Sequence, residues 1–184
     1  DRYGADAVRY YFLKEIEFGR DGDFNEERFV SILNADLANS LGNLLNRSLG
    51  MAVKYCQQTV PVYCPSDLSG LIEPVIQLAA SLGGRVADAY ISLDFRKVCE
   101  DILSLVWGCN KLIDDAAPWQ LYKAGKQAEV NALIYTLLEA IRTTAFLISP
   151  ITPSLSREIY RQLGLGFEES QPPGWDHSKW GILE

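Results

Sequence analysis

The sequence predicts an all-α protein built as an antiparallel helix bundle. Apolar residues recur every three or four positions along almost every segment, which is the helical period. Short stretches rich in glycine, proline and aspartate separate these segments, as expected for tight connections. The chain has 184 residues, 48% of them hydrophobic, so it is long enough to bury one core.

The first elements are a helix over residues 3–15 and a glycine- and aspartate-rich loop over residues 18–24. A long helix is expected from about residue 25 to 55. Asn25 is a suitable N-cap, and acidic residues follow it in the first turn. Its expected apolar stripe is Leu33, Leu37, Leu41, Leu44, Leu45, Ala52 and Tyr55. The opposite, polar face is expected to carry Asp36, Asn39, Asn43, Asn46, Arg47 and Lys54.

Further helices are expected over about residues 67–93 and from residue 94 to about 113. Pro74 could kink or restart the first of these, and Gly83 with Gly84 weakens its middle. Asp94 is the expected cap of the second, which stops at residues 114–119. Its expected buried stripe is Phe95, Val98, Ile102, Leu105, Val106, Leu112 and Ile113.

The remaining helices are expected at about residues 128–148 and, in a short element capped by Ser154, up to Gly164. The first should present one apolar stripe, which consists of Leu133, Leu137, Leu138, Ile141, Ala145 and Ile148. The C-terminal tail, residues 167–184, is rich in proline, glycine and tryptophan. We expect it to be irregular and to lie over the surface or over a neighbouring domain.

Several classes of function are disfavoured by composition. No run reaches the roughly 18 unbroken apolar residues of a membrane span, so no membrane contact is expected. The four cysteines form no CxxC pair and His177 is the only histidine, which disfavours a metal site. His177 is expected to be an exposed side chain of the polar tail, and no catalytic residues are predicted. The thiols should be reduced and, at Cys99 and Cys109, buried.

The net charge of −7 argues against broad binding of a polyanion, because phosphate affinity comes from clustered lysine and arginine. This charge is compatible with recognition of a few bases by stacking and hydrogen bonding.

Two features of the sequence could contact such bases. Asn43 and Arg47 lie one turn apart on the polar face of the long helix. A carboxamide offers a donor and an acceptor, and a guanidinium offers a planar fork of donors, so the pair could read the edge of an unpaired base. The alternative, which spacing alone favours, is that both side chains only decorate a solvated surface.

The second feature is the Pro118–Trp119 pair after the helix that ends near residue 113. Proline fixes the turn, with Pro118 in a supporting role. Trp119 is then either a lid on the core or an exposed platform for a base. Because large aromatic side chains are usually packed, the pattern by itself favours the lid.

At these residues the chain resembles the methionyl-tRNA synthetase family of bacterial or organellar type, over nearly its whole length. Four blocks occur in the family's order and at similar intervals. They are DRYGADAVRYY (residues 1–11), FGxDGDF (residues 18–24), NADLANxLGNLLNR (residues 34–47) and APW (residues 117–119).

The resemblance implies a helical anticodon-binding domain of a class I synthetase. Residues 1–24 would form a stem-contact or linker element, residues 25–166 the bundle, and residues 167–184 the tail. Asn43, Arg47 and Trp119 would recognise the CAU anticodon of tRNA(Met), with Trp119 stacking on a base. The partners implied are that anticodon loop and the catalytic Rossmann domain of the same chain.

The activity implied for the parent protein is the ATP-dependent charging of tRNA with methionine. The family's HIGH and KMSKS motifs and its zinc-bearing insertion are absent from this sequence. We therefore expect no catalytic residue and no cofactor in this fragment, and ATP with Mg²⁺ in the parent enzyme. A bacterial cytoplasm is the expected location, and a mitochondrion or chloroplast is the alternative, since the tail also resembles plant-organellar members.

Two other interpretations remain open. Isoleucyl, valyl, leucyl and cysteinyl synthetases carry similar bundles, although the Pro118–Trp119 pair and the FGxDGDF turn (residues 18–24) favour methionine. A helical module that binds protein partners through Trp175, Trp180 and its acidic faces is the alternative from a different class.

Overall fold

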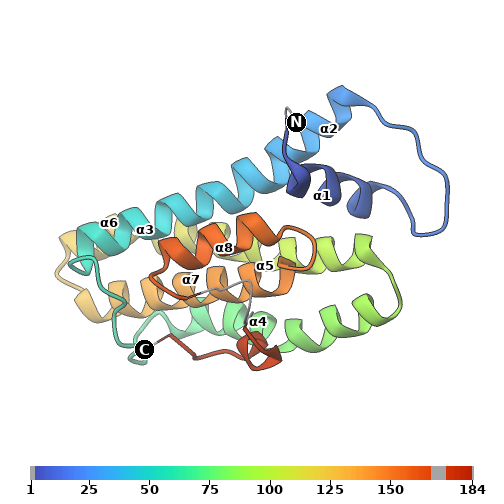
Figure 1. Cartoon of the computed structure of the whole chain (residues 1–184). Coiled ribbons are helices and arrows are strands. Elements are labelled where there is room, and N and C mark those ends of the chain that lie inside the picture. Colours follow the sequence, from blue (N-terminus) through green and yellow to red (C-terminus); the bar gives the residue numbers. More distant parts are fainter. Residues whose placement is uncertain (1–2, 167–172, 184) are drawn as a thin grey trace.

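The computed structural model describes residues 3–166 and 173–183, and within these ranges the chain is helical, with no strand. The all-α prediction is therefore confirmed (Figure 1). The elements, in chain order, are α1 (Ala5–Glu15), α2 (Glu26–Ile32), a π-helical segment (Leu33–Gly42), α3 (Asn43–Tyr55), α4 (Ser69–Ile91), α5 (Phe95–Ala116), α6 (Pro118–Lys123), α7 (Gln127–Ile148), α8 (Pro153–Gln162) and a 3₁₀ turn (Trp175–Ser178).

The predicted long helix is formed by α2, the π-helical segment and α3, which follow one another without a break. Asn25 caps it as expected, because its side-chain oxygen accepts a hydrogen bond from the backbone N–H of Arg28 at 2.8 Å. Glu26 and Glu27 occupy the first turn, where acidic side chains complement the helix dipole.

The middle of this helix differs from the prediction. Asp36, expected on the exposed polar face, is only 6% exposed. It accepts a hydrogen bond from the Tyr10 hydroxyl at 2.9 Å and pairs with Lys14, both on α1. The prediction assumed α-helical angles, whereas a π-helix bonds each N–H one residue further back and so alters which residues share a face. The packing of α1 then supplies Asp36 with its buried partners.

Helix α7 is the centre of the bundle. Every residue from 132 to 148 is buried, so the predicted single apolar stripe is wrong and the helix is enclosed on all sides. Among the described residues α7 is the one helix long and apolar enough to span a membrane, but 89% of the relevant window is buried against its neighbours. Its apolar character is therefore accounted for by its central place in the bundle.

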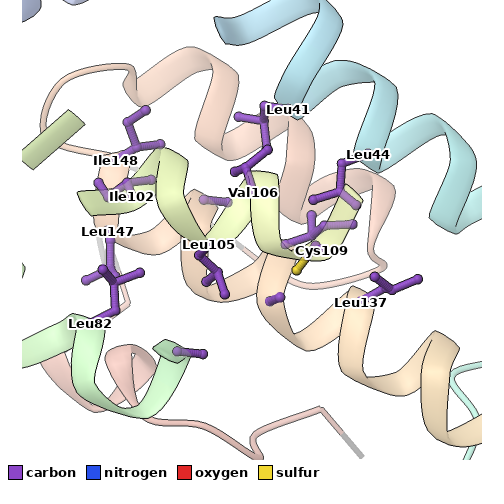
Figure 2. Close-up of a cluster of buried hydrophobic side chains, with 14 of the residues drawn as sticks. Leu41, Leu44, Leu82, Ile102, Leu105, Val106, Cys109, Leu137, Leu147 and Ile148 are labelled. Carbon is purple, nitrogen blue, oxygen red and sulfur yellow. The ribbon is translucent and has the colours of Figure 1, made fainter. Parts of the chain in front are cut away.

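The core lies where α4, α5 and α7 meet the long helix. Figure 2 shows side chains from all of these elements converging, including Leu44, Leu82, Leu105 and Leu137. The Cys109 thiol belongs to this cluster and is free and fully buried, as predicted. Burial raises its pKa to about 12, so the thiol stays protonated and behaves as a small apolar group.

Several helix ends refine the prediction. Asp94 caps α5, as expected, through a 3.0 Å hydrogen bond from the Lys97 N–H. Helix α4 runs without interruption past Pro74. The N-cap of α8 is Thr152 and not Ser154, because Pro153 is already its first residue. Gly164 ends α8 in the left-handed region, at φ 76°, as expected for a glycine after a helix.

The tail is bound to a buried ion pair within α7. Glu139 and Arg142 are both fully buried and pair at 2.8 Å. Arg142 donates to the backbone carbonyls of residues 177 and 179. The Glu139 carboxylate accepts the N–H groups of residues 181, 182 and 183, at 2.7, 2.9 and 3.2 Å. The described tail, residues 173–183, thus includes a 3₁₀ turn and is fixed to the bundle, more ordered than the expected irregular cover. Residues 167–172 and 184 of the predicted tail lie outside the described residues.

Two further residues show how closely the tail packs. A Cβ added at Gly83 would lie 3.1 Å from the Ser178 hydroxyl, so glycine at this point of α4 lets the tail approach. His177, predicted to be exposed, is half-buried beside the rings of Phe146 and Tyr160. Burial and the nearby positive charge of Arg142 lower the pKa of His177.

Replacing Arg142 with methionine should destabilise the fold by about 3–5 kcal/mol, because the Glu139 carboxylate would stay buried without its countercharge. Urea denaturation measures this change. Arg161→Met is the matched control, since Arg161 pairs with Glu158 at the surface and its loss should leave the midpoint almost unchanged. Equal effects of the two substitutions would contradict a structural role for the buried pair.

The lowered pKa of His177 predicts a pH dependence of stability. A neutral histidine is favoured in the folded state, so its contribution is present above its ordinary pKa and is lost as the pH falls towards the folded pKa. Between about pH 7 and pH 5, the melting temperature should fall more for the wild type than for His177→Gln. Parallel curves for the two proteins would refute this assignment.

Candidate nucleic-acid interface

The polar face of α3 begins with Asn43, which is exposed and is the first residue of that helix. Arg47 follows one turn later on the same side and is half-buried. Since α3 continues directly from the π-helical segment, Asn43 lies within a continuous helix and its side chain is not needed as a cap. The two predicted base-reading residues therefore share one surface.

Arg47 also connects α3 to α5. One of its terminal nitrogens lies 2.6 Å from a carboxylate oxygen of Asp114, in the last turn of α5. The Asp114 side chain is 66% exposed and that of Arg47 is 29% exposed, so the pair is accessible from solvent. This bond engages one nitrogen of a group that carries five N–H donors. The guanidinium is held in place and retains donors for a ligand.

The turn between α5 and α6 positions Trp119. Ala117 has φ 45° and ψ 62°, a left-handed conformation that is uncommon for residues other than glycine. Pro118 explains this ending, because the residue before a proline is disfavoured in the α-helical region. Pro118 itself is buried as the first residue of α6, a short helix that the sequence analysis did not anticipate.

Trp119 is 51% exposed, so the lid interpretation is wrong and the side chain offers part of its indole to solvent. One turn further along α6, the ring of Tyr122 lies 4.5 Å from that of Tyr55 on α3. This contact places α6 alongside α3, as Figure 1 shows. The structure thus brings Asn43, Arg47 and Trp119 onto adjoining elements, connected by the Arg47–Asp114 pair and by the turn at Ala117.

Sequence reasoning missed two contributors to this surface. Asp114 was predicted only to lie where the helix stops, yet it pairs with Arg47. Asn110, also on α5, donates to the backbone carbonyl of Ser40 at 3.2 Å and so joins α5 to the π-helical segment. Asn110 and Asp114 are four residues apart, so the sequence indicated that they share one face of α5. It did not indicate their partners, which lie about 70 positions away in the chain.

The groups on this surface suit recognition better than catalysis. A carboxamide, a guanidinium and an indole can hydrogen-bond and stack on a flat heterocycle. Across the described residues no three side chains of His, Cys, Asp or Glu are grouped as a metal site would need. Trp175 and Trp180, through which a protein-interaction module would bind its partners, both contact other parts of this chain. Trp180 packs against the core, and the ring of Trp175 lies 5.7 Å from that of Phe146.

Comparison with known proteins gives the same assignment. The family model described as "Anticodon-binding domain of tRNA ligase" matches residues 76–177. The model described as "tRNA synthetases class I (M)" matches residues 1–49.

The chain is 54% identical over 180 residues to a methionine–tRNA ligase of Synechocystis sp., covering 98% of this chain and 32% of the relative. It is 39% identical to a chloroplastic/mitochondrial methionine–tRNA ligase of Arabidopsis thaliana, covering 100% of this chain and 30% of the relative. A solved Mycobacterium tuberculosis methionyl-tRNA synthetase, bound by methionyl-adenylate, superposes with a TM-score of 0.83 at 33% identity. That match covers 90% of this chain and 33% of the other.

The chain thus spans about a third of the length of the curated relatives that it matches. Its helical fold and both family models agree. The chain belongs to the family of anticodon-binding domains of tRNA ligases, in its methionyl-tRNA synthetase branch.

Proposed function

We propose that this chain recognises the CAU anticodon of tRNA(Met), as part of an enzyme that charges this tRNA with methionine. The observation that carries the proposal is the half-exposed Trp119 beside a helix face on which Arg47 is held by Asp114. Membership in the methionyl branch supports the identity of the tRNA.

The proposed mechanism is a clamp on unpaired bases. Trp119 stacks on one base, while Asn43 and Arg47 hydrogen-bond to base edges. Separating bases from the loop stack costs a few kcal/mol, and stacking on an aromatic side chain returns about 1–3 kcal/mol per base. Hydrogen bonds from a guanidinium that Asp114 already orients require less loss of side-chain entropy on binding.

For the whole protein, the proposal includes a catalytic domain in the same chain, and ATP with Mg²⁺ for activating methionine. In this proposal the catalytic domain binds ATP and Mg²⁺, and the part of the protein described here selects the tRNA. Because the relatives include bacterial and chloroplastic/mitochondrial ligases, the proposed location is a bacterial cytoplasm, with an organelle interior as the alternative.

The Trp119→Ala variant of the full-length enzyme should bind tRNA(Met) about 5- to 100-fold more weakly, because a stacking surface is lost. Aminoacylation at limiting tRNA should fall accordingly. Methionine-dependent ATP–pyrophosphate exchange requires no tRNA and should be unchanged. If exchange fell as much as aminoacylation, Trp119 would be a structural residue and the proposal would fail.

The Arg47→Lys variant tests whether the planar fork of donors matters. Lysine keeps the charge and the pairing with Asp114 but cannot present two parallel N–H groups to a base, so we expect binding to weaken about 10-fold or more. Arg161→Lys, which changes an arginine in another surface ion pair, serves as the matched control and should bind normally. If Arg47→Lys bound tRNA(Met) as tightly as the wild type, Arg47 would contribute only its positive charge and not its planar donors.

A further inference from the structure

A second tryptophan lies open on the outer face of α5. Trp107 is 51% exposed, the same fraction as Trp119. Unlike Trp175, which contacts the ring of Phe146, Trp107 has no aromatic partner among the residues that the structure describes. Half of its indole is therefore accessible to a ligand, and the place of Trp107 in the fold indicates the kind of ligand.

The position of Trp107 is fixed relative to the proposed anticodon surface. Trp107 and Asp114 are seven residues apart on one helix, which places them on nearly the same face about 10.5 Å apart. Asp114 holds Arg47. Between them, Asn110 donates to the backbone of Ser40 in the π-helical segment. This side of α5 therefore adjoins the long helix at the stretch that ends in Asn43.

We propose that Trp107 is a second stacking platform. It holds an unpaired base that lies in the same anticodon loop, next to the CAU triplet. This inference rests on the proposed function. Trp119 and the face of α3 hold the triplet, and Trp107 lies about two helical turns along α5 from the Asp114 carboxylate, within reach of a neighbouring nucleotide of a splayed loop.

The surroundings of Trp107 favour a single base over other ligands. Its neighbours on the outer face of α5 are Glu100, Ser104 and Lys111, all polar and at least partly exposed. A protein partner would need a wider apolar patch at the centre of its interface. A phosphate would need clustered positive charge, whereas Lys111 is the one cation among these three neighbours and it pairs with Asp115. Stacking on an indole needs neither, because every base has a flat π-face.

The test uses the full-length enzyme and an anticodon stem-loop RNA that carries CAU. Trp107→Ala should weaken binding about 5- to 100-fold, and Trp107→Phe should restore most of it, because phenylalanine keeps a flat aromatic face. The matched control is Trp175→Ala, which removes an equally exposed indole from the tail and should bind like the wild type.

A second set of RNAs, each abasic at one loop position, identifies the contact. For one position outside the triplet, removing the base should abolish the difference between wild type and Trp107→Ala. If the difference persisted for every abasic RNA, Trp107 would not stack on a base and the inference would be overturned. It would also be overturned if Trp107→Ala bound the stem-loop normally but lost aminoacylation, since Trp107 would then contact another part of the protein.

Binding by the Trp107 and Trp119 variants distinguishes failure of the second platform from failure of the proposed function. Normal binding by Trp107→Ala together with weak binding by Trp119→Ala would overturn only the second platform. Normal binding by both variants would overturn the anticodon assignment itself.

Discussion

The enclosure of α7 from residue 132 to residue 148 is the constraint on which this bundle depends. A helix buried on every side leaves no water to solvate the charges of Glu139 and Arg142, and their pairing alone leaves further donors and acceptors unsatisfied. The tail supplies the missing partners, since its carbonyls accept from the guanidinium and its N–H groups donate to the carboxylate. The last residues described are therefore part of the hydrogen-bonding of the core.

This arrangement also leaves room for the proposed anticodon surface. With α7 in the centre and the tail packed against α4, the long helix, α5 and α6 retain faces open to solvent. Arg47 and Asp114 meet on those faces in a solvent-accessible pair. Such a pair contributes little to stability, which leaves its geometry available for recognition. The rigid core and the accessible surface are thus separated within one small domain.

The acidic character of the chain agrees with this picture. A domain with a net charge of −7 gains little from the phosphate backbone of a nucleic acid, so the proposed recognition relies on stacking and on base edges. The exposed indoles and the paired guanidinium have the chemistry that the proposed recognition needs without a basic patch.

Local chemistry in the sequence determined much of the fold. Asn25 and Asp94 mark helix starts because a short polar side chain can accept a backbone N–H, and this depends on residues three positions away. The spacing of Asn43 and Arg47 likewise requires only the helical period. The Pro118–Trp119 turn was identified from proline alone, and the family from ordered blocks of residues.

What the sequence did not determine depends on partners distant in the chain. Asp36 was assigned to the surface because its buried partners lie on α1 and because a π-helical segment shifts the angular positions. The central place of α7 follows from packing against helices distant in the chain, and the tail is bound through contacts about 40 residues apart. The exposure of Trp119 was decided by the turn at Ala117 and by what its neighbours leave uncovered. Burial is a property of the assembled bundle, so only the tertiary structure could decide it.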